Sequence, residues 1–479
     1  MAVFLNESCV ISQILSHIGY DRGMRTVRQN AYKCMETSLS RNLLFQQTVI
    51  SGSKGEGLSA LYESDFDFMY VLPNVVCSEH PVQLYSGEQM NRFVLFKRGF
   101  APGYALLQLI NICENLPVTD IIKDCLVELL PEQYYISSDI WKQIFKQSSI
   151  ESCLQPGNRG LRTTSNETHG PSVVISQFQT DCDRVYTMIC YCPTYLYSWV
   201  TRKRQYNWPT TAVIEEVSEL ESHAVPVGNI NSPLQFLEWR ICYTRGEIKL
   251  IHTLPDCLVK VYILMKAIAK VALKPISKDM SSYIIKNIVL WTAELSPFVC
   301  FSEGNLVTIL QYALKFLKQC LVQNNLPSYM IPERNLFADR VTLQQRSRLC
   351  MRIHSLLREG PSVVLRVKKM RDALNMLYRS PEEFRLFSVR RQKVETLMLL
   401  FNVYTSENFS GGIRDIETNI RILLTDGVFN KIGQCVCIIL GLDGISGDAA
   451  LRIDPDDVIR TVRGTEEGRL ISILRKYVY

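Results

Sequence analysis

Residues 50–72, ISGSKGEGLSALYESDFDFMYVL, combine a glycine-containing turn with two closely spaced carboxylates. Because side chains alternate along a strand, Asp65 and Asp67 share one face and the intervening aromatic residues enter the core on the other. Two carboxylates on one face are unfavourable unless a cation neutralises them, and the turn at Gly52 and Ser53 can present backbone N–H groups to phosphate. The combination predicts a magnesium–triphosphate site suited to nucleotidyl transfer, whereas Asp-x-Asp alone is more typical of a solvated strand edge.

A two-metal site needs a third acidic ligand from elsewhere in the chain. The segment DRVYTM, residues 183–188, has the composition of a strand and begins with Asp183. Asp183 is therefore the candidate third carboxylate, although a capping or loop aspartate explains the same spacing equally well.

Three regions of the chain must position these residues. The patterns predict a helix over 8–45 that is interrupted near Gly19 and Gly23, a strand–turn–helix–strand unit over 46–75, and helices from 256 to about 325.

Basic residues on the first predicted helix fall on roughly one side: Arg22, Arg25, Arg28 and Lys33. The spacing favours a solvated helix face, and the alternative is a contact with nucleic acid. The run 202–204, Arg-Lys-Arg, is a second candidate for such a contact.

Composition excludes few classes of function. The 479 residues carry 53 basic and 47 acidic side chains, and the net charge of +6 is too small to demonstrate nucleic-acid binding. The sixteen cysteines include no Cys-x-x-Cys pair, and no apolar run reaches membrane-spanning length. The first residues lack the pattern of a signal peptide, so we expect a reduced, cytoplasmic protein that does not enter a membrane.

Several blocks recur in the order of a known family: SGSKGEGL with ESDFDFMYVL, GPSVV before CDRVYTM, NWP, EWRICYTRGEIKLI, CLVKVYILMK, SSYIIKNIVLW and YMIPERNLF. They span roughly residues 10–360, and the chain thereby resembles the Mab-21-like proteins and cyclic GMP-AMP synthase, including the cGAS-like receptors of invertebrates. The resemblance implies a bilobal α+β fold. It places a mixed-sheet nucleotidyltransferase lobe with an N-terminal spine helix in 1–255, a helical C-terminal lobe in 256–360, and a helical extension of unknown role in 361–479.

The resemblance also implies a role for each site residue. Gly52 and Ser53 form the turn that grips the nucleotide, and Asp65, Asp67 and Asp183 hold two Mg²⁺ or Mn²⁺ ions. The remaining matches are Arg240 for the acceptor nucleotide, Lys266 and Ser282 for the donor triphosphate, and Tyr283 for stacking on a base. Lysine and tyrosine suit phosphate and base contacts, but without the resemblance a solvated Lys266 and a core Tyr283 are the simpler interpretations.

Two departures from the family bear on the trigger and the product. His252 and Cys257 stand almost adjacent where cyclic GMP-AMP synthase has a zinc-binding insertion, so no zinc is expected and double-stranded RNA is favoured over DNA as activator. Cys242 and Thr244 replace two serines, which leaves the choice of base open.

The activity implied by the resemblance is metal-dependent nucleotidyl transfer from ATP and/or GTP. The product would be a cyclic dinucleotide second messenger in innate immune sensing, triggered by nucleic acid. One alternative is a catalytically silent Mab-21-like binding or scaffold protein that keeps the fold, and another is a nucleic-acid-binding module. The oligomeric state and the phosphodiester linkage stay open.

Overall fold

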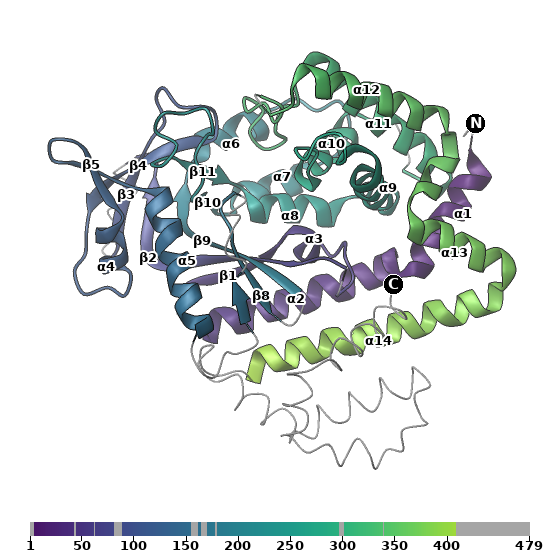
Figure 1. The fold of residues 1–479 in the computed structure, drawn as a ribbon, viewed down its shortest axis with the longest axis horizontal. Helices are drawn as coiled ribbons and strands as arrows, with labels where there is room; N and C mark the ends of the chain where they lie inside the picture. The colour runs from purple at the N-terminus through teal and green to yellow at the C-terminus, as the bar shows by residue number, and fades with distance from the viewer. Residues whose placement is uncertain are drawn as a thin grey trace, which may run out of the picture.

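The computed structural model describes residues 4–42, 45–61, 63–80, 89–154, 161–163, 170–177, 180–296, 301–338 and 340–408. One large sheet lies beside a group of helices, and two long helices run along the lower side of the molecule in Figure 1. The predicted mixture of sheet and helices is confirmed. The predicted extension over 361–479 is described only as far as residue 408.

Eleven strands form the sheet within the described residues. They are β1 (Gln47–Ser51), β2 (Phe66–Ser78), β3 (Asn91–Phe96), β4 (Tyr104–Asn111), β5 (Leu126–Leu130), β6 (Gln133–Ile136), β7 (Leu161–Thr163), β8 (Val173–Gln177), β9 (Thr180–Tyr191), β10 (Ser222–Val225) and β11 (Trp239–Cys242).

The sheet brings together strands that are distant in sequence. Its order is β1-β2-β3-β4-β11-β10-β9-β8-β7, and β2 also pairs in parallel with β9. This pairing closes a ring of strands through β3, β4, β11 and β10 and places the predicted strand around residue 185 directly beside the one around residue 68.

Helices surround the sheet and fill the second half of the described chain. They are α1 (Leu5–Leu15), α2 (Arg22–Asn42), α3 (Gly52–Gly55), α4 (Thr119–Asp124), α5 (Ser138–Leu154), α6 (Pro193–Val200), α7 (Thr211–Ser218), α8 (Thr244–Thr253), α9 (Asp256–Ile268), α10 (Ser282–Leu295), α11 (Leu306–Gln323), α12 (Leu343–Arg358), α13 (Lys368–Arg379) and α14 (Pro381–Asn408). Short π-helical or 3₁₀ turns are η1 (Ser16–Tyr20), η4 (Ala269–Leu273), η5 (Glu303–Asn305) and η6 (Gly360–Arg366).

The first helix is broken where the sequence predicts a break. Gly19 has φ +91°, a left-handed conformation that glycine adopts without a steric penalty, and it separates α1 from α2. Gly23 instead lies inside the first turn of α2, so the predicted break falls at Gly19 and does not extend to Gly23. The helical region also begins at Leu5 and ends at Asn42 rather than spanning 8–45.

One large hydrophobic cluster extends through both the sheet and the helices of the described chain. Its buried side chains include Ile11 on α1, Val75 on β2, Leu258 on α9 and Phe384 on α14. Helix α9 is buried on nearly every side, which explains its almost uninterrupted apolar sequence. Because the core crosses the predicted boundaries after residues 255 and 360, the division into domains stays a prediction.

Candidate functional site

The Gly-Ser turn follows strand β1 and forms the short helix α3. Gly52 has φ +61°, and a Cβ atom on it would lie 2.0 Å from Oδ2 of Asp67. Ser51 pairs with Asp67 in the sheet register and donates its hydroxyl to the Asp67 carbonyl at 3.2 Å. Glycine is therefore required at position 52, because only a residue without a side chain lets the carboxylate approach the turn.

Strand β2 alternates as predicted. Phe66 and Phe68 stack with ring centroids 5.4 Å apart and pack on a hydrophobic cluster that includes Tyr32 of α2. Asp67, between them, belongs to the lining of a cleft. The aromatic face of β2 thus holds the strand against α2 while the carboxylate face is left for the cleft.

The structure places two of the three predicted carboxylates next to each other. Asp67 on β2 and Asp183 on β9 are register partners in a parallel pair, so their side chains leave the same face of neighbouring strands, which lie about 4.8 Å apart. Burial first, and then the negative charges of Asp183 and Glu56, together raise the pKa of Asp67 from 3.8 to about 6. Asp65 is exposed and lies just before β2 begins.

A divalent cation fits this pair of carboxylates. Asp67 is held next to Asp183 on the neighbouring strand, and burial together with the nearby acids disfavours its charged form. Mg²⁺ commonly takes one or two carboxylates and completes its shell with phosphate and water. Within the described residues no three His, Cys, Asp or Glu side chains are arranged as a complete metal-binding group. Convergence of Asp65 with Asp67 and Asp183 therefore stays a prediction.

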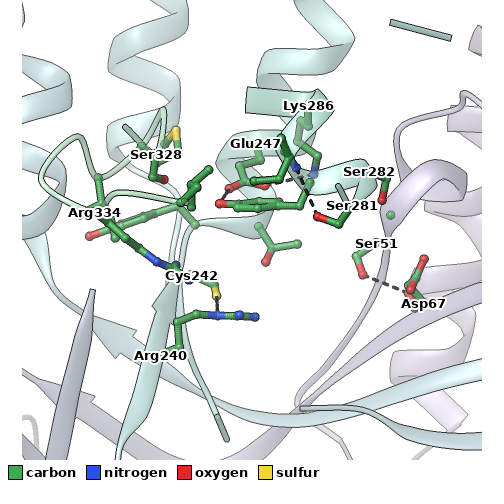
Figure 2. A pocket seen from close by; sticks show the side chains of 18 of the residues that line it. Ser51, Asp67, Arg240, Cys242, Glu247, Ser281, Ser282, Lys286, Ser328 and Arg334 are labelled. Atoms are coloured by element: carbon green, nitrogen blue, oxygen red, sulfur yellow. Dashed lines mark hydrogen bonds and ion pairs between the residues drawn. The ribbon is translucent and has the colours of Figure 1, made fainter. Parts of the chain in front are cut away.

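A cleft of about 440 Å³ opens beside Asp67. Figure 2 shows Ser51 and Asp67 on one side of it, Arg240, Cys242 and Arg334 on another, and Glu247 and Lys286 between them. Six of the nine predicted site residues are among those that line it: Gly52, Ser53, Asp67, Arg240, Ser282 and Tyr283.

Lys266 reaches the same site from behind the turn. Its Nζ atom donates a hydrogen bond to the Ser53 hydroxyl, and burial lowers the pKa of the lysine. Because Ser53 itself lines the cleft, Lys266 lies one side chain away from the ligand space. Lys266, Asp65 and Asp183 are thus the three predicted site residues that do not line the cleft.

Lys286 is a residue of the site that the sequence analysis did not identify. Its Nζ atom lies 2.7 Å from Oε1 of Glu56 and 3.1 Å from Oε2 of Glu247. Tyr283 donates its hydroxyl to the other Glu247 oxygen at 2.9 Å, and burial followed by the Glu247 charge raises its pKa to about 12. A signal was present in the sequence, because Tyr283 and Lys286 are three residues apart and must share one face of a helix.

Cationic side chains line the cleft opposite the carboxylates. Arg240 on β11 donates from Nε to the Cys242 sulfur at 3.3 Å. Cys242 is one of the two residues that stand in place of serines of the family. The Arg334 guanidinium carbon lies 5.1 Å from the centre of the Tyr104 ring. These two arginines allow the cleft to take an anionic ligand whose other end meets Asp67.

The predicted basic surface on the first helix is not a free surface. Arg25 is 6% exposed and forms an ion pair with Asp256, and Arg28 is fully buried against Glu395. A nucleic-acid contact through Arg25 and Arg28 is therefore wrong, and Arg22 and Lys33 alone stay exposed.

The second basic run is also largely engaged within the molecule. Arg202 and Arg204 both bind the Glu294 carboxylate, at 2.8 Å and 3.2 Å. The guanidinium of Arg202 also lies over the Trp291 ring at 4.3 Å. Only Lys203 between them is exposed, so this run is a structural ion-pair cluster rather than a basic patch.

His252 has a role other than metal binding in the described structure. Its Nε2 atom lies 2.9 Å from the carbonyl oxygen of Gly55, at the end of the turn that begins with Gly52, and Cys257 is buried. The expectation that the protein binds no zinc stays a prediction. None of the helices in the described ranges is both long and apolar enough to cross a membrane.

Part of the chain matches a known family. Residues 257–355 match the model of the Mab-21 protein HhH/H2TH-like domain. The matched range begins in α9 and ends in α12, and it contains Lys266, Ser282, Tyr283 and Lys286 on the helical side of the cleft. The resemblance drawn from the sequence motifs is confirmed over these residues.

Proposed function

We propose, from the premise that this chain is a member of the Mab-21 family of nucleotidyltransferase-like proteins, that it is a metal-dependent nucleotidyltransferase. The substrates would be ATP and/or GTP and the product a cyclic dinucleotide. The observation that carries the proposal is the pairing of Asp67 with Asp183 beside a cleft whose opposite wall holds Arg240 and Arg334. A bilobal arrangement, with the sheet and the helical group as two lobes around this cleft, belongs to the same proposal.

The residues divide into those that hold cations and those that hold the nucleotide. Asp67 and Asp183, with Asp65, would hold the Mg²⁺ or Mn²⁺ ions, which supply Lewis-acid activation of a ribose hydroxyl and neutralise the leaving triphosphate. Because Asp67 has a raised pKa, binding of a cation and loss of its proton are linked, and affinity falls as the pH drops through about 6.

The nucleotide would be held by the turn and by the helical side of the cleft. Ser53 and Lys266, already hydrogen-bonded to each other, would bind the triphosphate together with Ser282. Tyr283 would stack on a base, and its hydrogen bond to Glu247 fixes the ring in one orientation. Arg240 would contact the acceptor nucleotide from strand β11.

The trigger and setting are part of the proposal as well. We infer cytoplasmic nucleic-acid sensing in innate immunity, with double-stranded RNA favoured over DNA. Since Arg25 and Arg28 are buried, the contact surface must lie elsewhere. Residues 343–393 hold thirteen Lys or Arg side chains, of which Arg391 is buried, and four Asp or Glu side chains. The remainder of the chain has an acidic excess, so this segment is the strongest candidate.

A second candidate function is a silent Mab-21-like scaffold that keeps the fold. It is favoured by one observation, namely that no three acidic, histidine or cysteine side chains of the described ranges form a ready metal-binding group. A scaffold would bind nucleotide in the cleft without turning it over.

Product analysis separates the two candidates. Purified protein would be incubated with labelled ATP and GTP, Mn²⁺ or Mg²⁺, and double-stranded RNA, double-stranded DNA or neither. We expect a cyclic dinucleotide that disappears in Asp183→Asn, the variant that keeps the size of the side chain and removes its charge. Nucleotide binding without any product under all three conditions would contradict transfer and establish the scaffold.

A further inference from the structure

The chain beyond the matched Mab-21 domain returns to the site through two helices. After α12 and η6, α13 leads into α14, which runs along α2 in Figure 1 and packs against both α2 and the break η1. A Cβ atom on Gly19 in this break would lie 1.5 Å from Nη1 of Arg391, so the glycine makes room for a side chain of α14. The last described helix, α14, therefore docks on α2 and on the break that precedes it.

A fully buried ion-pair cluster fixes this docking. The Arg28 guanidinium binds Glu395 through two bonds, Nε to Oε1 at 2.7 Å and Nη2 to Oε2 at 2.8 Å, and Arg391 adds a third at 2.9 Å. Arg28 also donates from Nη1 to the carbonyl of Gly57 at 3.3 Å. Gly57 lies after the Gly-Ser turn, so the cluster reaches the segment that leads from this turn to the metal carboxylates.

Helix α13 reaches the same segment directly. Lys369 Nζ lies 3.3 Å from Oε1 of Glu63 and 3.2 Å from the Tyr20 hydroxyl, which itself donates to Glu63. The second oxygen of Glu63 accepts the backbone N–H of Ala60 at 3.0 Å. Glu63 stands two residues before Asp65, so the ion pair closes a turn immediately ahead of the predicted ligands.

The same segment is also held from the Gly-Ser turn. Lys54, in the Gly-Ser turn, is buried and donates to the carbonyl oxygens of Ala60 at 3.1 Å and Leu61 at 2.5 Å. The path from Gly57 to Asp65 thus has anchors from the turn, from α2 and from α13. Only the anchors from α13 and α14 come from chain beyond the matched domain.

We propose that α13 and α14 form an intramolecular brace that positions residues 57–61 and 63–65, and that Lys369 and Glu63 are positioning residues for the metal carboxylates of the cleft. The role of the brace in transfer rests on the function proposed above. Its role in ordering the segment does not, because that follows from the contacts alone. The brace gives the otherwise unexplained helices after residue 360 a function at the site.

The test compares Lys369→Met with Lys123→Met in the full-length protein. Lys123 also pairs with a glutamate, Glu114 at 2.6 Å, but it lies on α4, at the opposite side of the molecule from α13 in Figure 1. The readouts are amide hydrogen exchange at residues 57–61, the dissociation constant for Mn²⁺ alone, and kcat and KM for ATP without RNA.

We expect Lys369→Met to speed exchange at residues 57–61 and to weaken Mn²⁺ binding on the order of tenfold. The value of kcat/KM should fall by about 10–100-fold, and Lys123→Met should change none of the three. Lys369→Arg, which keeps the charge, should restore most of each loss. Combining Lys369→Met with Glu63→Gln should add little to either single change, because both remove the same contact.

Unchanged exchange and Mn²⁺ affinity in a folded Lys369→Met protein would overturn the brace. If that variant does not fold, Glu63→Gln, which keeps the shape of the side chain, replaces it in the same comparison. A wild-type protein that makes no product overturns the proposed function only, since exchange and Mn²⁺ binding still test the brace.

Discussion

The cleft around Asp67 and the cluster around Glu395 both bury carboxylates, but the pKa of the buried carboxylate is raised in the first and lowered in the second. At Asp67 burial and neighbouring acids raise the pKa to about 6. At Glu395 burial would also raise the pKa, but Arg28 and Arg391 outweigh it and hold the pKa below its ordinary value. The first arrangement is complete only when a cation enters, whereas the second already contains its cations.

This comparison separates a binding site from a structural contact without reference to activity. Both carboxylates are held by the fold, so burial alone does not distinguish them. What distinguishes them is whether the protein supplies the opposite charge: Glu395 has two guanidinium partners, and the largest electrostatic effects on Asp67 come from other acids. Perturbed groups of the first kind are characteristic of functional sites.

Among the variants that test this difference between the two carboxylates, the largest effect is expected at Asp67. Asp67→Asn should lower the rate of transfer by about a hundredfold or more, because it removes a charge that holds a cation at the transition state. The same change should raise the free energy of unfolding of the metal-free protein by on the order of 1 kcal/mol, since it removes like-charge repulsion. Product assays and thermal unfolding in the presence of a chelator measure the two effects. Loss of stability instead of gain would show that Asp67 is not electrostatically frustrated.

The corresponding change in the other cluster should act mainly on stability, and on transfer only through the brace that this cluster holds in place. Glu395→Gln leaves Arg28 and Arg391 buried without their counter-ion, so we expect a loss of about 3–5 kcal/mol in the free energy of unfolding. Urea unfolding monitored by circular dichroism measures it. Replacing Glu395 together with Arg28 and Arg391 by apolar residues of similar size should recover part of the loss, and a loss below about 1 kcal/mol in the single variant would contradict the burial of this pair.

The two clusters also predict opposite responses to pH. Because the pKa of Asp67 is raised in the folded state, its contribution to stability is largest below its unfolded value and is lost as the pH rises from about 4 through about 6. Because the pKa of Glu395 is lowered, its contribution is present above the unfolded value near 4.3 and is lost as the pH falls below it. Metal-free melting curves of the wild type, Asp67→Asn and Glu395→Gln from about pH 2 to pH 8 should separate these contributions. The wild type should lose stability relative to Asp67→Asn as the pH rises from about 4 to about 6, and a difference between the two proteins that stays constant over this range would contradict the raised pKa of Asp67.

The smallest effect is expected at an ion pair on the solvent side of α14. Arg385 and Glu382 are 3.1 Å apart, but their side chains are 65% and 80% exposed. Arg385→Gln should therefore change the free energy of unfolding by less than about 1 kcal/mol, and increased salt should reduce the effect further. A change as large as that of Glu395→Gln would mean that exposure does not govern the strength of ion pairs on this helix.

The parts of the site that depend on local sequence could be predicted. Alternation along β2 was sufficient to place Asp67 and the two phenylalanines on opposite faces, and the turn at Gly52 follows from its spacing. The break at Gly19 was also predictable, since glycine is the residue that tolerates its backbone conformation.

The parts that depend on distant partners could not be predicted. Arg28 looks like a solvated residue in a helical pattern, because its partner Glu395 lies 367 positions later. Arg25 has its partner Asp256 231 positions away, and the pairing of β2 with β9 that brings Asp183 to Asp67 is equally remote in sequence. For Lys286 the helical spacing gives the face, but only the fold shows that Glu56 and Glu247 meet it there.

The separation of Arg28 from Glu395 has a consequence for synthesis of the protein. At translation rates of roughly 5–20 residues per second, about 20–70 s pass between the appearance of the arginine and that of its partner. During this interval α2 can pack on the nascent sheet, but its guanidinium has no counter-ion, and the segment before Asp65 lacks Lys369 as well. The order of the chain therefore makes the loop of the cleft one of the last parts of the molecule to be fixed on the ribosome.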